Sequence, residues 1–135
     1  MKNGFALAAL AFGAVSALAS SGVAEEKLES RMGVKATLDT TAKKATIVIK
    51  GNDDKVYVNT EYGTKCSVTI AAGGKLEKAE LAKADGVFEP SGKEGKAKSA
   101  TFKVGADKAI EGKCKLVACT TEACSSPFEV SFKSQ

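Results

Sequence analysis

Residues 34–50, with the sequence VKATLDTTAKKATIVIK, alternate apolar and polar side chains on both sides of a polar turn. The apolar positions that share one face are Val34, Ala36, Leu38, Ala45, Ile47 and Ile49. A period of two residues is the period of a β-strand, in which successive side chains point to opposite faces. The stretch therefore predicts a β-hairpin with one buried face and one solvated face.

The same alternation recurs along the rest of the chain, in residues 56–58, 66–70, 100–104, 114–118 and 128–132. Turn residues separate these runs, as in Gly51–Asp54 and around Gly73 and Gly74. Only residues 76–84 are ambiguous, because their Leu, Lys, Glu and Ala favour a helix although an extended segment is the alternative. We expect an all-β fold, an immunoglobulin-like antiparallel β-sandwich of about seven or eight short strands.

The amino-terminal segment 1–24 has the pattern of a secretory signal peptide. Lys2 precedes an apolar run over residues 5–18, and small residues that suit cleavage follow, ending at Ala24. A membrane anchor is the alternative, but about 14 apolar residues are too few to span a bilayer. We expect a periplasmic or secreted protein with a leader at 25–33, a domain at 34–135 and no stable membrane insertion after cleavage.

Composition excludes several classes of function. The chain has no histidine, which removes the usual general base and the commonest metal ligand, and we expect no metal and no cofactor. The net charge is +4, but Arg31 is the only arginine, and the lysine-rich stretch 93–115 has Phe102 as its only aromatic residue. Nucleic-acid surfaces combine arginine with stacking aromatic residues, so a solvated basic face is favoured over nucleic-acid binding.

The four cysteines predict two disulfides in an oxidising compartment, and four cysteines allow three pairings. Cys114 and Cys119 lie on one predicted strand about 16 Å apart, whereas a disulfide needs Cα atoms within about 7 Å. Pairing Cys114 with Cys124 fails for a similar reason if the chain turns back near Cys119. Cys66–Cys114 and Cys119–Cys124 remain as the predicted pairs.

The two predicted disulfides have different consequences. Cys66 and Cys114 sit on apolar strand faces, so their bond is a candidate structural disulfide that could cross the sandwich core. In the chain-entropy relation, closing so long a loop stabilises the folded protein by about 4 kcal/mol. Cys119 and Cys124 enclose four residues, for which the same relation gives about 2 kcal/mol. A weakly stabilising disulfide at an accessible strand end is the type that exchanges with thiols.

The register beside this second pair contains a conflict. If Cys119 lies directly opposite Cys124, Leu116 faces Pro127, and Phe128 falls on the polar face of the preceding strand. An inward-facing Phe128 therefore requires a one-residue slip or a bulge near the cysteines.

Residues 112–127, GKCKLVACTTEACSSP, resemble the amino-terminal, immunoglobulin-like periplasmic domain of the transmembrane thiol–disulfide interchange reductase family. The shared pattern is a glycine, a strand, a small residue before a cysteine, a short polar loop, a second cysteine and a proline. Tyr57-Val58-Asn59 and Glu61-Tyr62 fit the family's order loosely. The chain departs from the pattern of residues in four ways: the cysteine loop is one residue shorter than usual, Val117 stands where an aromatic residue is common, Pro127 is single where two prolines are common, and Cys66 and Cys114 are additional.

The resemblance implies that Cys119 and Cys124 are a redox pair that exchanges with a thioredoxin-like protein or domain. Because the chain has no histidine, lysine side chains or backbone N–H groups would have to stabilise the thiolate, and Lys113 and Lys115 are nearest in sequence. The alternative is a non-catalytic binding or accessory module of the cell envelope, in which both disulfides are structural.

Overall fold

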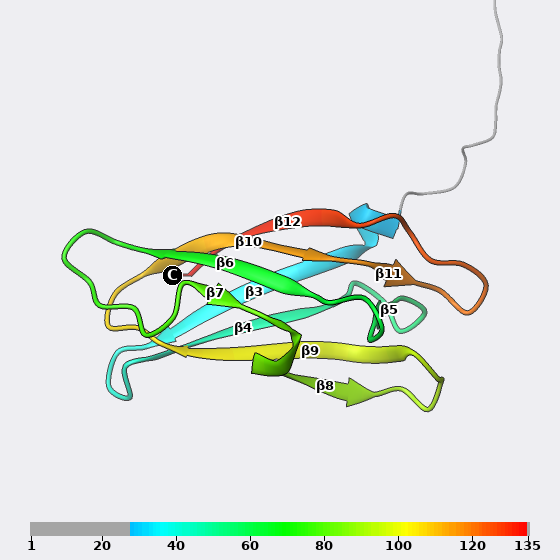
Figure 1. The fold of residues 1–135 in the computed structure, drawn as a ribbon, viewed down its shortest axis with the longest axis horizontal. Coiled ribbons are helices and arrows are strands. Elements are labelled where there is room, and N and C mark those ends of the chain that lie inside the picture. The colour runs from blue at the N-terminus through cyan, green and yellow to red at the C-terminus, as the bar shows by residue number, and fades with distance from the viewer. Residues whose placement is uncertain (1–27, 135) are drawn as a thin grey trace, which may run out of the picture.

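The computed structural model describes residues 28–134, so the predicted signal segment 1–24 lies outside the described residues (Figure 1). The long strands are β3 (Met32–Asp39), β4 (Lys44–Gly51), β6 (Lys65–Ile70), β8 (Gly86–Pro90), β9 (Lys96–Gly105), β10 (Ile110–Leu116) and β12 (Phe128–Lys133). Three shorter strands are β5 (Tyr57–Asn59), β7 (Glu80–Leu81) and β11 (Ala118–Cys119). Two 3-10 turns, η2 (Leu28–Arg31) and η3 (Lys83–Asp85), complete the elements. The chain is all-β, as its alternation predicts.

The first hairpin forms as the opening stretch predicts. β3 and β4 pair antiparallel, with Val34 opposite Ile49 and Ala36 opposite Ile47. The turn is held by Asp39, whose Oδ1 accepts the backbone N–H groups of Thr41 and Ala42, each at 3.0 Å. Asparagine and aspartate favour turns because of this local hydrogen bonding.

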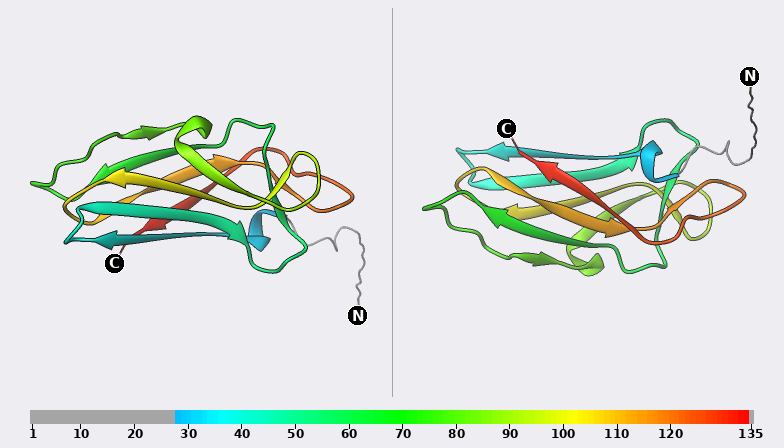
Figure 2. Two further views of the ribbon diagram at one scale, coloured as in Figure 1. Left: turned by 90° about the horizontal axis from the view of Figure 1, so that it is seen from below. Right: turned by 90° about the horizontal axis from the view of Figure 1, so that it is seen from above.

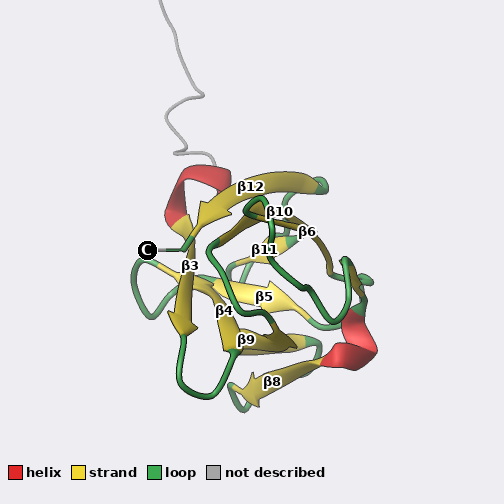
Figure 3. Cartoon of the chain, turned by 90° about the vertical axis from the view of Figure 1, so that its left-hand side faces the viewer, coloured by secondary structure: helices red, strands yellow, loops and turns green. Residues whose placement is uncertain are grey.

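The strands form two antiparallel sheets. One has the order β12-β10-β6-β7, and the larger follows β11-β5-β9-β4-β3, with β8 paired to β9. In the end-on view of Figure 3, β12, β10 and β6 lie above β4, β9 and β8. The edge strands β12 and β3 contact each other where the two layers meet (Figure 2).

Apolar side chains from both sheets form one core. Ile47, Ile49 and Phe102 from the larger sheet and Ile110 and Leu116 from the smaller sheet are all at most 1% exposed. Burying such side chains stabilises a fold by about 1.5–3 kcal/mol each relative to their exposure in the unfolded chain. The core thus fixes which face of each strand points inward, and it positions the strand ends that carry Cys119.

Two expectations from the sequence need correction, and one open alternative is decided. Met32 and Gly33, assigned to the leader, lie in β3, and Met32 is buried because it continues the inward face of Ala36. For residues 76–84, where the sequence left a helix and an extended segment open, the structure has no α-helix; Glu80 and Leu81 are extended, and Leu81 is buried opposite Cys66. Tertiary burial of Leu81 overrides a weak helix propensity.

The second correction concerns residues 114–118, which alternate as one strand in the sequence. β10 ends at Leu116, and Ala118 pairs with Val58 of β5 in the other sheet. Four consecutive side chains, Leu116 to Cys119, are buried, so Val117 does not face solvent. The chain passes from one sheet to the other here, and both of its faces meet protein.

In the described part of the chain, no helix has the length and apolar character needed to cross a membrane.

Candidate functional site

Both predicted disulfides are present, Cys66–Cys114 and Cys119–Cys124. The second joins two residues five positions apart, with Cα atoms 4.0 Å apart. Its two residues are in unequal environments, because Cys119 is 0% exposed whereas Cys124 is exposed. A reagent in solvent therefore reaches this disulfide from the Cys124 side.

The unequal burial follows from the change of sheet at Val117. β11 pairs with β5, with Cys119 opposite Tyr57, so the side chain of Cys119 is covered by the larger sheet. Cys124 lies on the returning strand, which continues into β12 of the smaller sheet. The disulfide thus sits at the end of the sandwich where the chain leaves one sheet and joins the other (Figure 1).

The predicted register slip is present at this point. Leu116 pairs with Phe128 and Cys114 with Val130, a register that would place Ser125 opposite Cys119. The isolated bridge instead places Cys124 opposite Cys119, a shift of one residue. The shift allows Phe128 to pack against the core while the cysteines still meet.

The loop between the two cysteines is closed by its own hydrogen bonds. Thr120 N–H donates to the carbonyl of Ala123 at 2.7 Å, and Thr120 Oγ1 accepts the N–H groups of Glu122 and Ala123, each at 3.2 Å. Just outside the loop, Ser125 N–H donates to the Ala118 carbonyl at 2.7 Å and Ala118 N–H donates to Ser125 Oγ at 3.1 Å. These bonds close the hairpin beside the disulfide.

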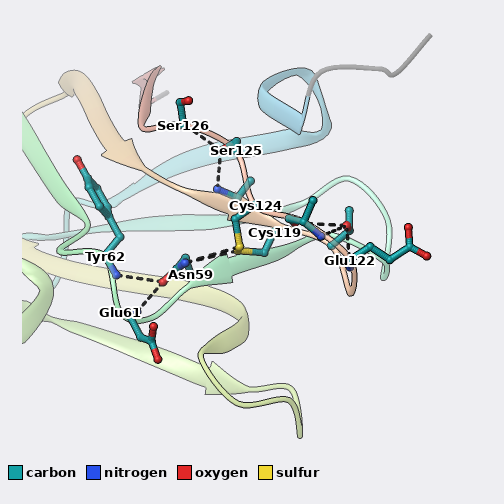
Figure 4. The surroundings of a disulfide bond; sticks show 11 residues. Asn59, Glu61, Tyr62, Cys119, Glu122, Cys124, Ser125 and Ser126 are labelled. Atoms are coloured by element: carbon teal, nitrogen blue, oxygen red, sulfur yellow. Dashed lines mark hydrogen bonds between the residues drawn. A yellow bond between two sulfur atoms is a disulfide. The ribbon is translucent and has the colours of Figure 1, made fainter. Parts of the chain in front are cut away.

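Asn59, the last residue of β5, contacts both sulfurs (Figure 4). Its Nδ2 lies 3.5 Å from Cys119 Sγ and 3.8 Å from Cys124 Sγ. In the sequence, Asn59 belongs to a segment that fits the order of the resembled family, but no role for it was predicted. The available signal was an asparagine at the end of an alternating run and before a turn, a position where its side chain bonds locally.

The lysines considered for thiolate stabilisation lie elsewhere. Lys113 and Lys115 are exposed on β10, and Lys113 Nζ is 3.5 Å from Glu129 Oε1 across the β10–β12 pair. Both point away from the core face that carries Cys114, because side chains alternate along the strand. The polar side chain at the sulfurs is the amide of Asn59.

The disulfide Cys66–Cys114 has a different geometry from the one expected. The two residues are direct register partners on the neighbouring strands β6 and β10, with Cα atoms 3.9 Å apart, so their bond lies within one sheet and does not cross the core. Both cysteines are 0% exposed. Alternation predicts which face of a strand is buried, but it does not predict which strand lies beside it. The expectation that this disulfide crosses the core was wrong for that reason.

Three carboxyl groups have a lowered pKa, and each holds a turn. Hydrogen bonds from Lys78 Nζ and from the Ala82 N–H lower the pKa of Asp85. The N–H of Lys55, assisted by Arg31, lowers the pKa of Asp53, and the N–H of Lys75 lowers that of Asp107. Asp53 is exposed and Asp85 and Asp107 are half-buried, and each of the three accepts a backbone N–H of its own turn or of a neighbouring turn, so the lowered pKa values report local turn structure.

Within residues 28–134, no group of three or more acidic or cysteine side chains is placed to hold a metal ion. No family model, curated protein or solved structure matches the chain.

Proposed function

We propose that the protein is a thiol–disulfide exchange domain of the periplasm or extracellular space, with Cys119 and Cys124 as its redox pair and a dithiol of a thioredoxin-like protein or domain as its partner. The observation that carries the proposal is the unequal burial of the two cysteine residues. Cys124 is exposed and Cys119 is 0% exposed, so one sulfur is available for attack and the other is held as the leaving group.

The exchange has two steps, each an attack of a thiolate on a disulfide sulfur. A partner thiolate attacks Cys124 Sγ, the Cys119–Cys124 bond breaks, and its electron pair passes to Cys119 Sγ as a thiolate. A second partner thiolate then attacks the partner sulfur of the mixed disulfide and releases the Cys124 thiolate. The partner dithiol becomes a disulfide, Cys119 and Cys124 become thiols, and each thiol takes a proton from solvent. The reverse sequence passes the electrons to an oxidised partner.

Three further features support this assignment. The loop between the cysteines is short, so in the chain-entropy relation this disulfide adds only about 2 kcal/mol to the stability of the folded protein. The resemblance of residues 112–127 and the immunoglobulin-like arrangement expected for the two sheets agree with the same family. The predicted signal segment 1–24 and the two disulfides agree with an oxidising compartment.

The first test is the reduction potential of each disulfide, measured by equilibration in dithiothreitol buffers, alkylation and peptide mass mapping. We expect Cys119–Cys124 to titrate above about −300 mV while Cys66–Cys114 stays oxidised. If both bonds resist reduction at that potential, the proposal is wrong and the alternative of a binding module with two structural disulfides takes its place.

The second test traps the mixed disulfide. Cys119→Ser leaves the exposed Cys124 as the only thiol, and Cys124→Ser leaves the buried Cys119. We expect Cys119→Ser to form a mixed disulfide with an oxidised thioredoxin-like domain and Cys124→Ser to form little or none. Equal trapping by the two variants would contradict the assigned roles of attacked and leaving sulfur.

A further inference from the structure

The amide of Asn59 is held in one orientation at the disulfide. Asn59 Oδ1 accepts the backbone N–H groups of Glu61 at 2.7 Å and Tyr62 at 3.0 Å. Because the oxygen is occupied by these two donors, the NH₂ group must face the other way, toward the sulfurs (Figure 4). The backbone of Asn59 is fixed as well, since its N–H donates to the Val117 carbonyl at 2.9 Å.

The donor lies closer to the sulfur that leaves. Nδ2 is 3.5 Å from Cys119 Sγ and 3.8 Å from Cys124 Sγ. A disulfide sulfur is a weak acceptor, whereas a thiolate is a charged acceptor, for which hydrogen bonds are about twice as strong. The contact therefore strengthens as the bond to Cys124 breaks and negative charge collects on Cys119.

We propose that Asn59 is a catalytic residue of the exchange, whose fixed amide stabilises the thiolate that Cys119 carries when Cys124 is attacked. This inference rests on the proposed redox function. Cys119 is buried, so its thiolate loses most of its contact with water and depends on a protein donor. The chain has no histidine, and the two lysines nearest in sequence to the cysteines are on the outer face of β10, so a neutral amide supplies this donor.

The kinetic consequence follows from the leaving group. A thiol–disulfide exchange is faster when the departing thiol has a lower pKa. By stabilising the departing thiolate, Asn59 makes Cys119 a better leaving group and speeds attack on Cys124. Removal of the donor should slow reduction of this disulfide and leave reduction of a remote disulfide unchanged.

The experiment compares two substitutions that separate the donor from the turn. Asn59→Ala removes both the NH₂ donor and the oxygen that caps Glu61 and Tyr62. Asn59→Asp retains an oxygen acceptor for those two N–H groups but removes the donor. Thr60→Asp is the matched control, because it adds the same charge at the next residue and keeps the Asn59 amide.

The first readout is the rate of reduction of Cys119–Cys124 by dithiothreitol at neutral pH. We expect both Asn59 variants to be about tenfold slower than the unmodified protein, and Thr60→Asp to stay within about threefold of it. The proposal is overturned if Asn59→Asp reacts at the unmodified rate while Asn59→Ala is slow, because the effect then comes from the turn. It is also overturned if Thr60→Asp is as slow as Asn59→Asp, because the effect is then one of charge.

The second readout is the pKa of the Cys119 thiol, measured from thiolate absorbance in a Cys124→Ser background in which Cys66–Cys114 stays oxidised. We expect Asn59→Ala to raise this pKa by about one unit, a tenfold change in the acid dissociation constant. An unchanged pKa would refute the role of Asn59. This measurement requires no exchange partner, so it separates failure of this inference from failure of the proposed function. If Asn59→Ala does not fold, Asn59→Asp is compared with Thr60→Asp in the same background, and equal pKa values in these two variants would refute the role of Asn59.

Discussion

The two disulfides share one chemistry but differ in how the fold holds them. Cys66–Cys114 joins register partners in the middle of a sheet, with both residues 0% exposed. Cys119–Cys124 joins two ends of a hairpin where the chain changes sheets, and one of its residues is exposed. The difference teaches that burial and loop length, and not the cysteines themselves, separate a structural bond from one suited to exchange.

The two disulfides also differ in the length of the loop that each one closes. The buried pair is separated by 48 positions and the hairpin pair by five. In the chain-entropy relation the long loop gains more, because its closure removes more freedom from the unfolded chain. The sheet interior therefore gains stability from its disulfide, whereas the hairpin end keeps much of its stability without one.

The largest expected effect is the loss of stability when each disulfide is removed. We expect Cys66→Ala with Cys114→Ala to lower the free energy of unfolding by about 4 kcal/mol, and Cys119→Ala with Cys124→Ala by about 2 kcal/mol or less. Urea unfolding followed by circular dichroism measures both values. The contrast between the two disulfides is wrong if removing Cys119–Cys124 lowers the free energy of unfolding as much as removing Cys66–Cys114.

A smaller but still large effect is expected for a glycine beside the buried disulfide. A Cβ atom at Gly112 of β10 would overlap the Ser67 carbonyl of β6 and lie 3.0 Å from the Phe132 ring. We expect Gly112→Ala to destabilise the protein by about 3 kcal/mol, because packed backbone there has little room to move. The measurement is the same urea titration.

The control for Gly112 lies in the loop that follows Asn59. A Cβ atom at Gly63 would meet no atom within 4 Å. Gly63→Ala should therefore change the free energy of unfolding by less than about 0.5 kcal/mol. Equal costs at the two glycines would show that the interior of the sheet adapts as readily as the loop.

The smallest expected effect is the acid dependence contributed by Asp85, which lies away from both disulfides in sequence. Its pKa is lowered from the ordinary 3.8, so the unfolded state binds more protons as the pH falls below about 4. The stabilisation by Asp85 is present above its unfolded pKa and is lost as the pH falls through the folded value. We expect Asp85→Asn to be slightly less stable than the unmodified protein near neutral pH, with the gap closing in acid.

Thermal melts across pH 2–6 would measure this gap. Asp54→Asn serves as the control, because Asp54 is an exposed turn carboxylate outside the pair that Asp85 forms with Lys78. A gap that widens as the pH falls would contradict the assigned sign. Both disulfides should stay oxidised throughout, so the effect concerns the turn alone.

Much of the fold was readable because alternation reports which face of a strand is buried. The β3–β4 hairpin, both cysteine pairings and the one-residue slip beside Cys119 follow from positions along the chain. Strand β8 was not predicted, because none of its residues is fully buried and its alternation is weak. For residues 76–84 the sequence left a helix and an extended segment open, and the burial of Leu81 opposite Cys66 decides for the extended form at Glu80 and Leu81.

The sequence by itself therefore determined the all-β class, the inward face of most strands and the disulfide pairs, since local period and loop geometry carry that information. Only the tertiary structure decided that the chain changes sheets at Val117, that Cys66 neighbours Cys114 within one sheet, and that Asn59 reaches the sulfurs of Cys119 and Cys124. Each of these depends on which strands become neighbours, and that choice is made by packing of the whole core.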